Sequence, residues 1–167
     1  MEKNVDNVYR IRPILPEDDA RLAEIIRQNL EKKHLNIPGT AYFDPELAHL
    51  SRFYAALPEK RAYFVAECGG EVLGGAGYAE CSAFENCAEL QKLYLSDSAK
   101  GKGLGRRLME TVEDRARQAD YRRLYLETHS ILDAAIRLYE RRGYRSIDRP
   151  PSVQHGTMDR FYLRELT

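Results

Sequence analysis

A glycine-rich segment with basic residues among its glycines is the part of the sequence best suited to hold a phosphate. Gly101, Gly103 and Gly105 precede an amphipathic stretch, where they let the backbone approach a ligand without interference from Cβ. The first N–H groups of a helix lack internal partners and, with the helix dipole, form an anion site. Four cationic residues add charge at the same place: Lys100, Lys102, Arg106 and Arg107. We therefore expect this segment to bind a pyrophosphate.

Two better-known phosphate loops do not fit this segment. In a P-loop the last glycine is followed by Lys and then by Ser or Thr, whereas Gly105 is followed by two arginines. The dinucleotide fingerprint would need a glycine at position 106, which is Arg106. One alternative stays open, a glycine-rich turn that only begins a solvated basic helix.

The composition narrows the class of protein. The 167 residues suit one domain over 1–167, and the 26 basic and 26 acidic residues cancel, which argues against a nucleic-acid partner. No apolar run is long enough for a membrane span or a signal segment, so we expect a cytoplasmic protein without a membrane partner. Cys68, Cys81 and Cys87 form no C-x-x-C pair. They predict free thiols, with a packing role or incidental redox sensitivity, and no metal site.

The apolar periodicity predicts an α/β fold that positions the glycine-rich segment. Alternating or continuous apolar runs predict strands over 8–14, 62–67, 72–81, 88–95, 123–128, 146–147 and 158–163. Helical spacing predicts helices over 15–30, 45–57, 103–119 and 132–142. The third helix begins at the glycines and carries an apolar stripe of Leu104, Leu108, Val112 and Ala116. A meander followed by strand–helix–strand–helix–strand predicts a mixed sheet with the glycines at a strand-to-helix turn.

Residues 100–105, KGKGLG, resemble the Gln/Arg-x-x-Gly-x-Gly/Ala signature of the GNAT superfamily of N-acetyltransferases. The one departure is Lys100, which keeps the charge of arginine but not its planar fork. The resemblance implies that the strand residues Leu93, Tyr94 and Leu95 contact the acyl and pantetheine part of acetyl-CoA. It implies further that its pyrophosphate is bound by Lys100, Gly101, Lys102, Gly103, Leu104, Gly105 and Arg106.

A second segment, residues 133–144, resembles the A-x-x-L-Y helix and turn of the same family. By position, Tyr139 corresponds to the tyrosine that protonates the departing CoA thiolate in many relatives. A phenol titrates near 10 and a thiol near 8.5, so the phenol is a modest acid for this step. The alternative is that Tyr139 only packs the helix on the sheet. Many relatives carry Asn where Leu132 stands, so one cofactor contact must come from elsewhere, with Ser130 or Asp133 as candidates.

The resemblance implies a GNAT-like mixed, mostly antiparallel sheet of six to seven strands with about four helices. It also implies direct attack of an amine on the thioester of acetyl-CoA, with the Leu95 N–H stabilising the oxyanion. Glu89 is the candidate base because it precedes Leu93 by four residues, which alternation would place on the same face. A water-mediated base and a solvated Glu89 remain open.

The acceptor is expected to be a small-molecule or peptide amine. Between Glu67 and Asp97 there are six acidic residues and one lysine, and a cationic amine would be favoured if they line the cleft. A solvated acidic face explains the same residues equally well. The alternatives are a non-catalytic acyl-CoA-binding or regulatory module, a longer acyl chain and a hydroxyl acceptor. The strand over 158–163 could lie at a sheet edge and pair with a second copy, giving a homodimer.

Overall fold

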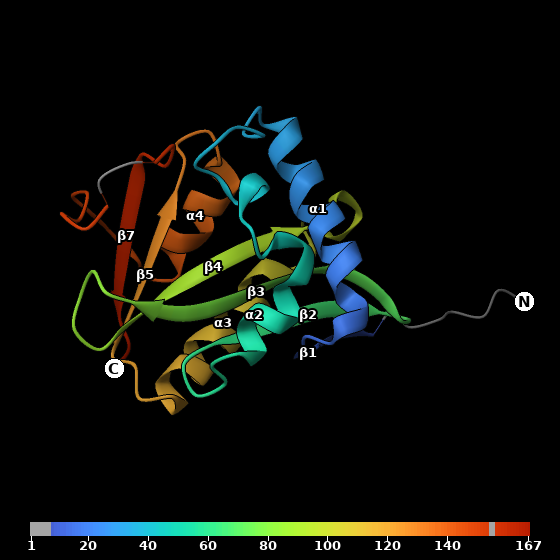
Figure 1. The fold of residues 1–167 in the computed structure, drawn as a ribbon, viewed down its shortest axis with the longest axis horizontal. Coiled ribbons are helices and arrows are strands. Elements are labelled where there is room, and N and C mark those ends of the chain that lie inside the picture. The colour runs from blue at the N-terminus through green and yellow to red at the C-terminus, as the bar shows by residue number, and fades with distance from the viewer. Residues whose placement is uncertain (1–7, 154–155) are drawn as a thin grey trace, which may run out of the picture.

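A seven-stranded sheet forms the centre of the molecule (Figure 1). The computed structural model describes residues 8–153 and 156–167, and its strand order is β1-β2-β3-β4-β5-β7-β6. Only β4 and β5 pair in parallel, and the other neighbours are antiparallel. The strands are β1 Tyr9–Pro13, β2 Ala62–Cys68, β3 Glu71–Cys81, β4 Cys87–Leu95, β5 Arg123–Thr128, β6 Arg145–Ile147 and β7 Arg160–Glu165. The predicted mixed, mostly antiparallel sheet is confirmed.

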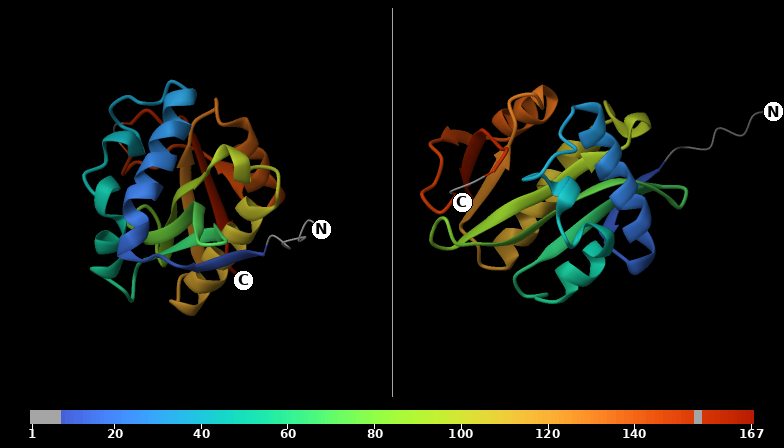
Figure 2. Two further views of the ribbon diagram at one scale, coloured as in Figure 1. Left: turned by 90° about the vertical axis from the view of Figure 1, so that its right-hand side faces the viewer. Right: turned by 45° about the horizontal axis from the view of Figure 1, so that its top comes forward.

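Helices cover both faces of this sheet. The described residues form four α-helices: α1 Asp19–Lys32, α2 Leu50–Ala55, α3 Leu104–Gln118 and α4 Asp133–Arg141. Two separate apolar cores result, with α1 and α2 packed on one face and α3 and α4 on the other (Figure 2). None of these helices is long and apolar enough to cross a membrane.

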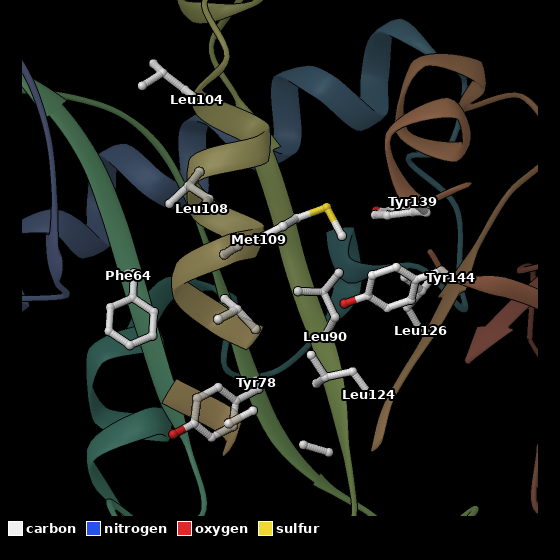
Figure 3. Close-up of a cluster of buried hydrophobic side chains, with 14 of the residues drawn as sticks. Phe64, Tyr78, Leu90, Leu104, Leu108, Met109, Leu124, Leu126, Tyr139 and Tyr144 are labelled. Atoms are coloured by element: carbon white, nitrogen blue, oxygen red, sulfur yellow. The ribbon is translucent and has the colours of Figure 1, made fainter. Parts of the chain in front are cut away.

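The core beneath α3 fixes the helix that follows the glycines. The predicted stripe is buried, with Leu104 1% exposed and Leu108, Val112 and Ala116 fully covered. These side chains pack on the sheet together with Met109, next to Leu90 and Tyr139 (Figure 3). Because burial of each such side chain stabilises by roughly 1.5–3 kcal/mol, the start of α3 is held firmly against the strands.

Two expected elements differ in the structure. The helix expected over 45–57 is divided, because His49 leaves the helical region at φ −139° and ψ 44°. The expected last strand begins later, at Arg160, because Asp159 instead bonds the backbone N–H and hydroxyl of Ser130. The expected edge position was also wrong, because β7 pairs with β5 on one side and with β6 on the other.

A buried carboxylate joins α3, α4 and β7, and its removal should destabilise the fold. Glu113 is 0% exposed and bonds Arg142 at 2.8 Å and also Arg164. We expect Glu113→Gln to cost about 2–3 kcal/mol in urea unfolding, somewhat less than a fully buried pair because the arginines are partly exposed. The control is Glu110→Gln, whose side chain is 38% exposed, with an expected cost below about 1 kcal/mol. Equal costs would contradict this view of the core.

Candidate active site

A cleft opens where β4 and β5 diverge. Their parallel pairing ends at Glu89 and Tyr125, and beyond that point a cavity of about 770 Å³ lies between the strands, α1, α3 and α4. Nine predicted site residues line it: Leu93, Tyr94, Leu95, Lys100, Gly101, Gly103, Gly105, Arg106 and Tyr139. Glu89, Lys102 and Leu104 do not line it. The fold therefore brings the strand, the glycine-rich loop and the tyrosine to one cavity.

A β-bulge in β4 sets the direction of the strand residues in this cleft. Gly75 faces Tyr94 but Gly77 faces Gln91, so two residues of β4 oppose one of β3, and Lys92 has a φ of 51°. Such an extra residue reverses the alternation of side chains. Leu93 packs in the core beneath α3, and Tyr94 packs in the core beneath α1.

The bulge also overturns one expectation about Glu89. Leu90 and Leu93 contact the same core, so Glu89 lies on the opposite face from Leu93. The expected shared face assumed an unbroken alternation, which Lys92 interrupts. Buried contacts stabilise the bulge, because the Lys92 carbonyl accepts from Tyr63 at 2.7 Å and the Lys92 ammonium lies 2.8 Å from Asp44.

The backbone of Leu95 is oriented toward the cleft. The Ser96 N–H donates to Leu73 at 2.8 Å, so Ser96 bonds toward β3 and Leu95, one residue away, faces the other side. On that side β5 has already diverged. The Leu95 carbonyl accepts from the Asn29 amide at 2.8 Å. Its N–H, pointing the same way, is placed to meet an oxygen in the cleft.

Asn29 of α1 is a site residue that the sequence interpretation missed. Its amide nitrogen bonds the carbonyls of Ile25 and Leu95, and its oxygen accepts from Lys100 at 3.0 Å. It thus joins α1, the end of β4 and the glycine-rich loop. The available signal was a polar residue on the otherwise apolar stripe of the first helix, between Ile26 and Leu30.

The glycine-rich loop presents an uncapped helix start. Gly101 and Gly103 have φ of 76° and 75°, the left-handed region in which glycine is favoured. Gly103 is the N-cap of α3, and no side chain caps the first N–H groups. A Cβ added at either glycine would meet nothing within 4 Å. Packing does not demand these glycines, and the space beside them is open to a ligand.

Tyr139 is both a core residue and a cleft residue. It is 7% exposed and packs beside Tyr144 and Tyr162, with ring centroids 6.1 and 6.3 Å away. Burial raises the pKa of its phenol well above the ordinary value. The hydroxyl is therefore held protonated and can act as a hydrogen-bond donor. Tyr139 thus packs in the core and also lines the cleft, and its role as proton donor stays a prediction.

Two carboxylates lie side by side near the cleft. Glu89 accepts from Gln91 at 3.2 Å, and Glu127 accepts from the Tyr125 hydroxyl at 2.9 Å. Burial, and then the charge of Glu127, raise the pKa of Glu89 to about 7. Glu127 lines the cavity and was not among the predicted residues. Its signal was a charged residue directly after the buried apolar run Leu124-Tyr125-Leu126.

The six acidic residues between Glu67 and Asp97 would favour a cationic amine only if they lined the cleft. None of these described residues lines the cavity. Glu67 bonds Arg12 at 3.0 Å, and Glu80 bonds Arg61 at 2.9 Å. Arg12 lies on β1 and Arg61 directly precedes β2, so the count of charges along the sequence did not predict which carboxylates line the cavity.

Comparison with known proteins assigns the class. The family model described as the acetyltransferase (GNAT) family matches residues 24–144, more than half of the chain. The uncharacterized N-acetyltransferase YjgM of Escherichia coli K12 is 36% identical over 140 residues, covering 83% of each chain. The chain therefore belongs to the GNAT acetyltransferase family, and it is an acyltransferase.

Solved structures share the fold. A GNAT-family acetyltransferase of Staphylococcus aureus Mu50 superposes with a TM-score of 0.81 at 22% identity, covering 96% of this chain and 100% of that one. The phosphinothricin acetyltransferase of Sinorhizobium meliloti, solved with acetyl-CoA, superposes with a TM-score of 0.73 at 23% identity, covering 94% and 88%.

Proposed function

We propose that this protein transfers the acetyl group of acetyl-CoA to a primary amine by direct attack in a ternary complex. One observation carries the proposal: the Leu95 N–H, the uncapped start of α3 and Tyr139 all face the same cavity. A helix start suits the pyrophosphate, and a strand N–H suits the developing oxyanion. The acetyl-CoA complex of the Sinorhizobium relative supports this choice of co-substrate.

The predicted cofactor residues other than Lys100, whose ammonium bonds Asn29 and Asp97, receive roles that their placement allows. Leu93, Tyr94 and Leu95 lie along the pantetheine arm, and the backbone N–H groups of residues 101–106 hold the pyrophosphate. Leu104 contributes only its backbone, because its side chain is buried in the core. Lys102 contributes charge from outside the cavity, because its side chain is exposed.

We assign deprotonation of the amine to Glu89, acting through Glu127 or an intervening water, because Glu89 itself does not line the cavity. Glu89 accepts a hydrogen bond from Gln91, and Glu127 accepts one from Tyr125. Among the described residues, no lysine or arginine forms an ion pair with either carboxylate. A cationic amine would therefore find negative charge that is not already neutralised at this end of the cleft.

The pH dependence of kcat/KM should reflect the protonation of Glu89. Its pKa is raised to about 7, so kcat/KM should fall about tenfold per pH unit below pH 7, where the carboxyl is protonated and cannot accept a proton. Glu89→Gln should remove this limb and lower the plateau by about tenfold, because water and Glu127 still assist. Glu80→Gln, which removes an exposed carboxylate, should keep the limb. A limb that survives Glu89→Gln would exclude Glu89 as the base.

Replacement of Asn29 is expected to slow the reaction. Asn29→Ala leaves the Leu95 carbonyl without its side-chain donor and leaves Lys100 bonded to Asp97 alone among the described residues. We therefore expect kcat/KM to fall about tenfold, equal to about 1.4 kcal/mol. Gln28→Ala is the matched control, because the Gln28 amide bonds Glu24 on the exposed face of the same helix. An unchanged rate for Asn29→Ala would show that the Leu95 peptide needs no support from α1.

A panel of acceptors tests the proposal. CoA release from acetyl-CoA would be followed by thiol detection with aliphatic amines, amino acids, peptides with a free amino group and alcohols. Acceleration by amines and by no alcohol is the expected result. Acceleration by alcohols alone would replace the amine with a hydroxyl acceptor.

A further inference from the structure

Two of the three thiols lie opposite each other at the closed end of the β3–β4 hairpin. Cys81 and Cys87 are direct partners in the antiparallel register, so their side chains project from the same face. Opposed residues in such a ladder have Cα atoms about 4.5–5.5 Å apart. This spacing lies within the roughly 4.4–6.8 Å that a disulfide spans. The register therefore gives the pair a Cα spacing that is compatible with a disulfide.

The environment makes the two thiols unequal. Cys87 is 3% exposed in a small apolar cluster with Tyr125 and Phe161, whereas Cys81 is partly exposed at its rim. The neighbouring Cys87 thiol lowers the pKa of Cys81 to about 7, and backbone groups of Ala83 and Phe84 add to this. The same contact, with burial, raises the pKa of Cys87.

We propose that Cys81 and Cys87 form a reversible intrachain disulfide by exchange with a small disulfide of the glutathione type. The Cys81 thiolate attacks one sulfur of that disulfide, whose S–S bond breaks and releases one thiolate. Cys87 then gives up its proton and attacks the Cys81 sulfur, which releases the second small thiol. Two protein thiols are oxidised and one small disulfide is reduced to two thiols.

The bond would form beside the carboxyl pair. Cys87 and Glu89 are two residues apart on β4 and share a face by alternation. A disulfide at this place would change the surroundings of Glu89 and so affect catalysis, an inference that rests on the proposed function. The chemistry of the thiols can be tested without any activity, so the two ideas can fail separately.

Peptide mapping of the folded protein without a reductant is the decisive experiment. After incubation with oxidised glutathione we expect a peptide bridged between Cys81 and Cys87, a loss of two hydrogens, and reversal by a dithiol. Cys68 is the internal control, because it is partly exposed on β2 and does not face Cys81 or Cys87 in the sheet. It should be glutathionylated more slowly or not at all. Cys87→Ala should trap glutathione on Cys81, and Cys68→Ser should leave the bridge intact. Stable glutathionylation of Cys81 in the unsubstituted protein, or a Cys81 no faster than Cys68, would overturn the proposal.

Discussion

Gly103→Glu is expected to abolish measurable acetyl-CoA binding while the protein stays folded. A Cβ at this position meets no protein atom within 4 Å, so the new side chain projects into the space where we place the pyrophosphate. Its carboxylate would repel the phosphates at the positive end of α3. We expect the dissociation constant in calorimetry to rise by at least about 100-fold, equal to about 2.8 kcal/mol.

The backbone cost of this change needs a matched control, because Gly103 has a φ of 75°. Gly70, in the turn between β2 and β3, has a φ of 83°, and a Cβ added there would also meet nothing within 4 Å. Gly70→Glu therefore carries the same strain of about 1–2 kcal/mol and the same charge, away from the cleft. It should bind acetyl-CoA like the unsubstituted protein. If both variants bound acetyl-CoA equally weakly, the loss of affinity would come from strain or net charge. The glycine-rich loop would then not be part of the cofactor site.

Tyr139→Phe is expected to lower kcat by about 100-fold with little change in acetyl-CoA affinity, because it removes a proton donor and little else. The ring keeps its packing beside Tyr144 and Tyr162. No described residue accepts a hydrogen bond from the Tyr139 hydroxyl, so no described partner is left unpaired. Steady-state rates, with a separate calorimetric titration, measure the two effects.

Tyr162→Phe is the control, because it also removes the hydroxyl of a buried tyrosine. Its hydroxyl bonds Glu140 at 3.1 Å and does not line the cavity. We expect a small loss of stability and an unchanged kcat. If Tyr139→Phe kept full kcat, Tyr139 would be a packing residue, and the thiolate would leave without help from it.

The glycine-rich loop could be predicted because its signals are local, whereas Tyr139 was predicted from the resemblance of residues 133–144 to the helix and turn of the family. Alternating glycines, clustered cations and a helical stripe lie within a few residues of one another, and the stripe from Leu104 to Ala116 is buried as its spacing predicted. The order of strands and helices likewise predicted the mixed sheet. Such features depend on the residue types of one segment, so tertiary contacts had little to correct.

The remaining parts of the site depend on contacts between distant segments. The Lys92 bulge is stabilised by Tyr63 and Asp44, which are 29 and 48 positions away, and it moved Glu89 to the other face. The Asn29 bond to Leu95 spans 66 positions. Glu127 reaches the cleft only because β5 diverges from β4. Spacing within one segment marks Asn29 and Glu127 as polar residues in apolar patterns, but it does not predict which distant residues they contact or where the bulge falls.

The most direct test of the central claim is the initial rate of CoA release measured against both acetyl-CoA and the best amine of the panel. Direct attack in a ternary complex predicts intersecting lines in double-reciprocal plots and no release of CoA when the amine is left out. Parallel lines, with a burst of CoA and an acetylated protein, would contradict direct attack. Tight binding of acetyl-CoA without turnover of any amine would contradict catalysis itself and favour a module that only binds acyl-CoA.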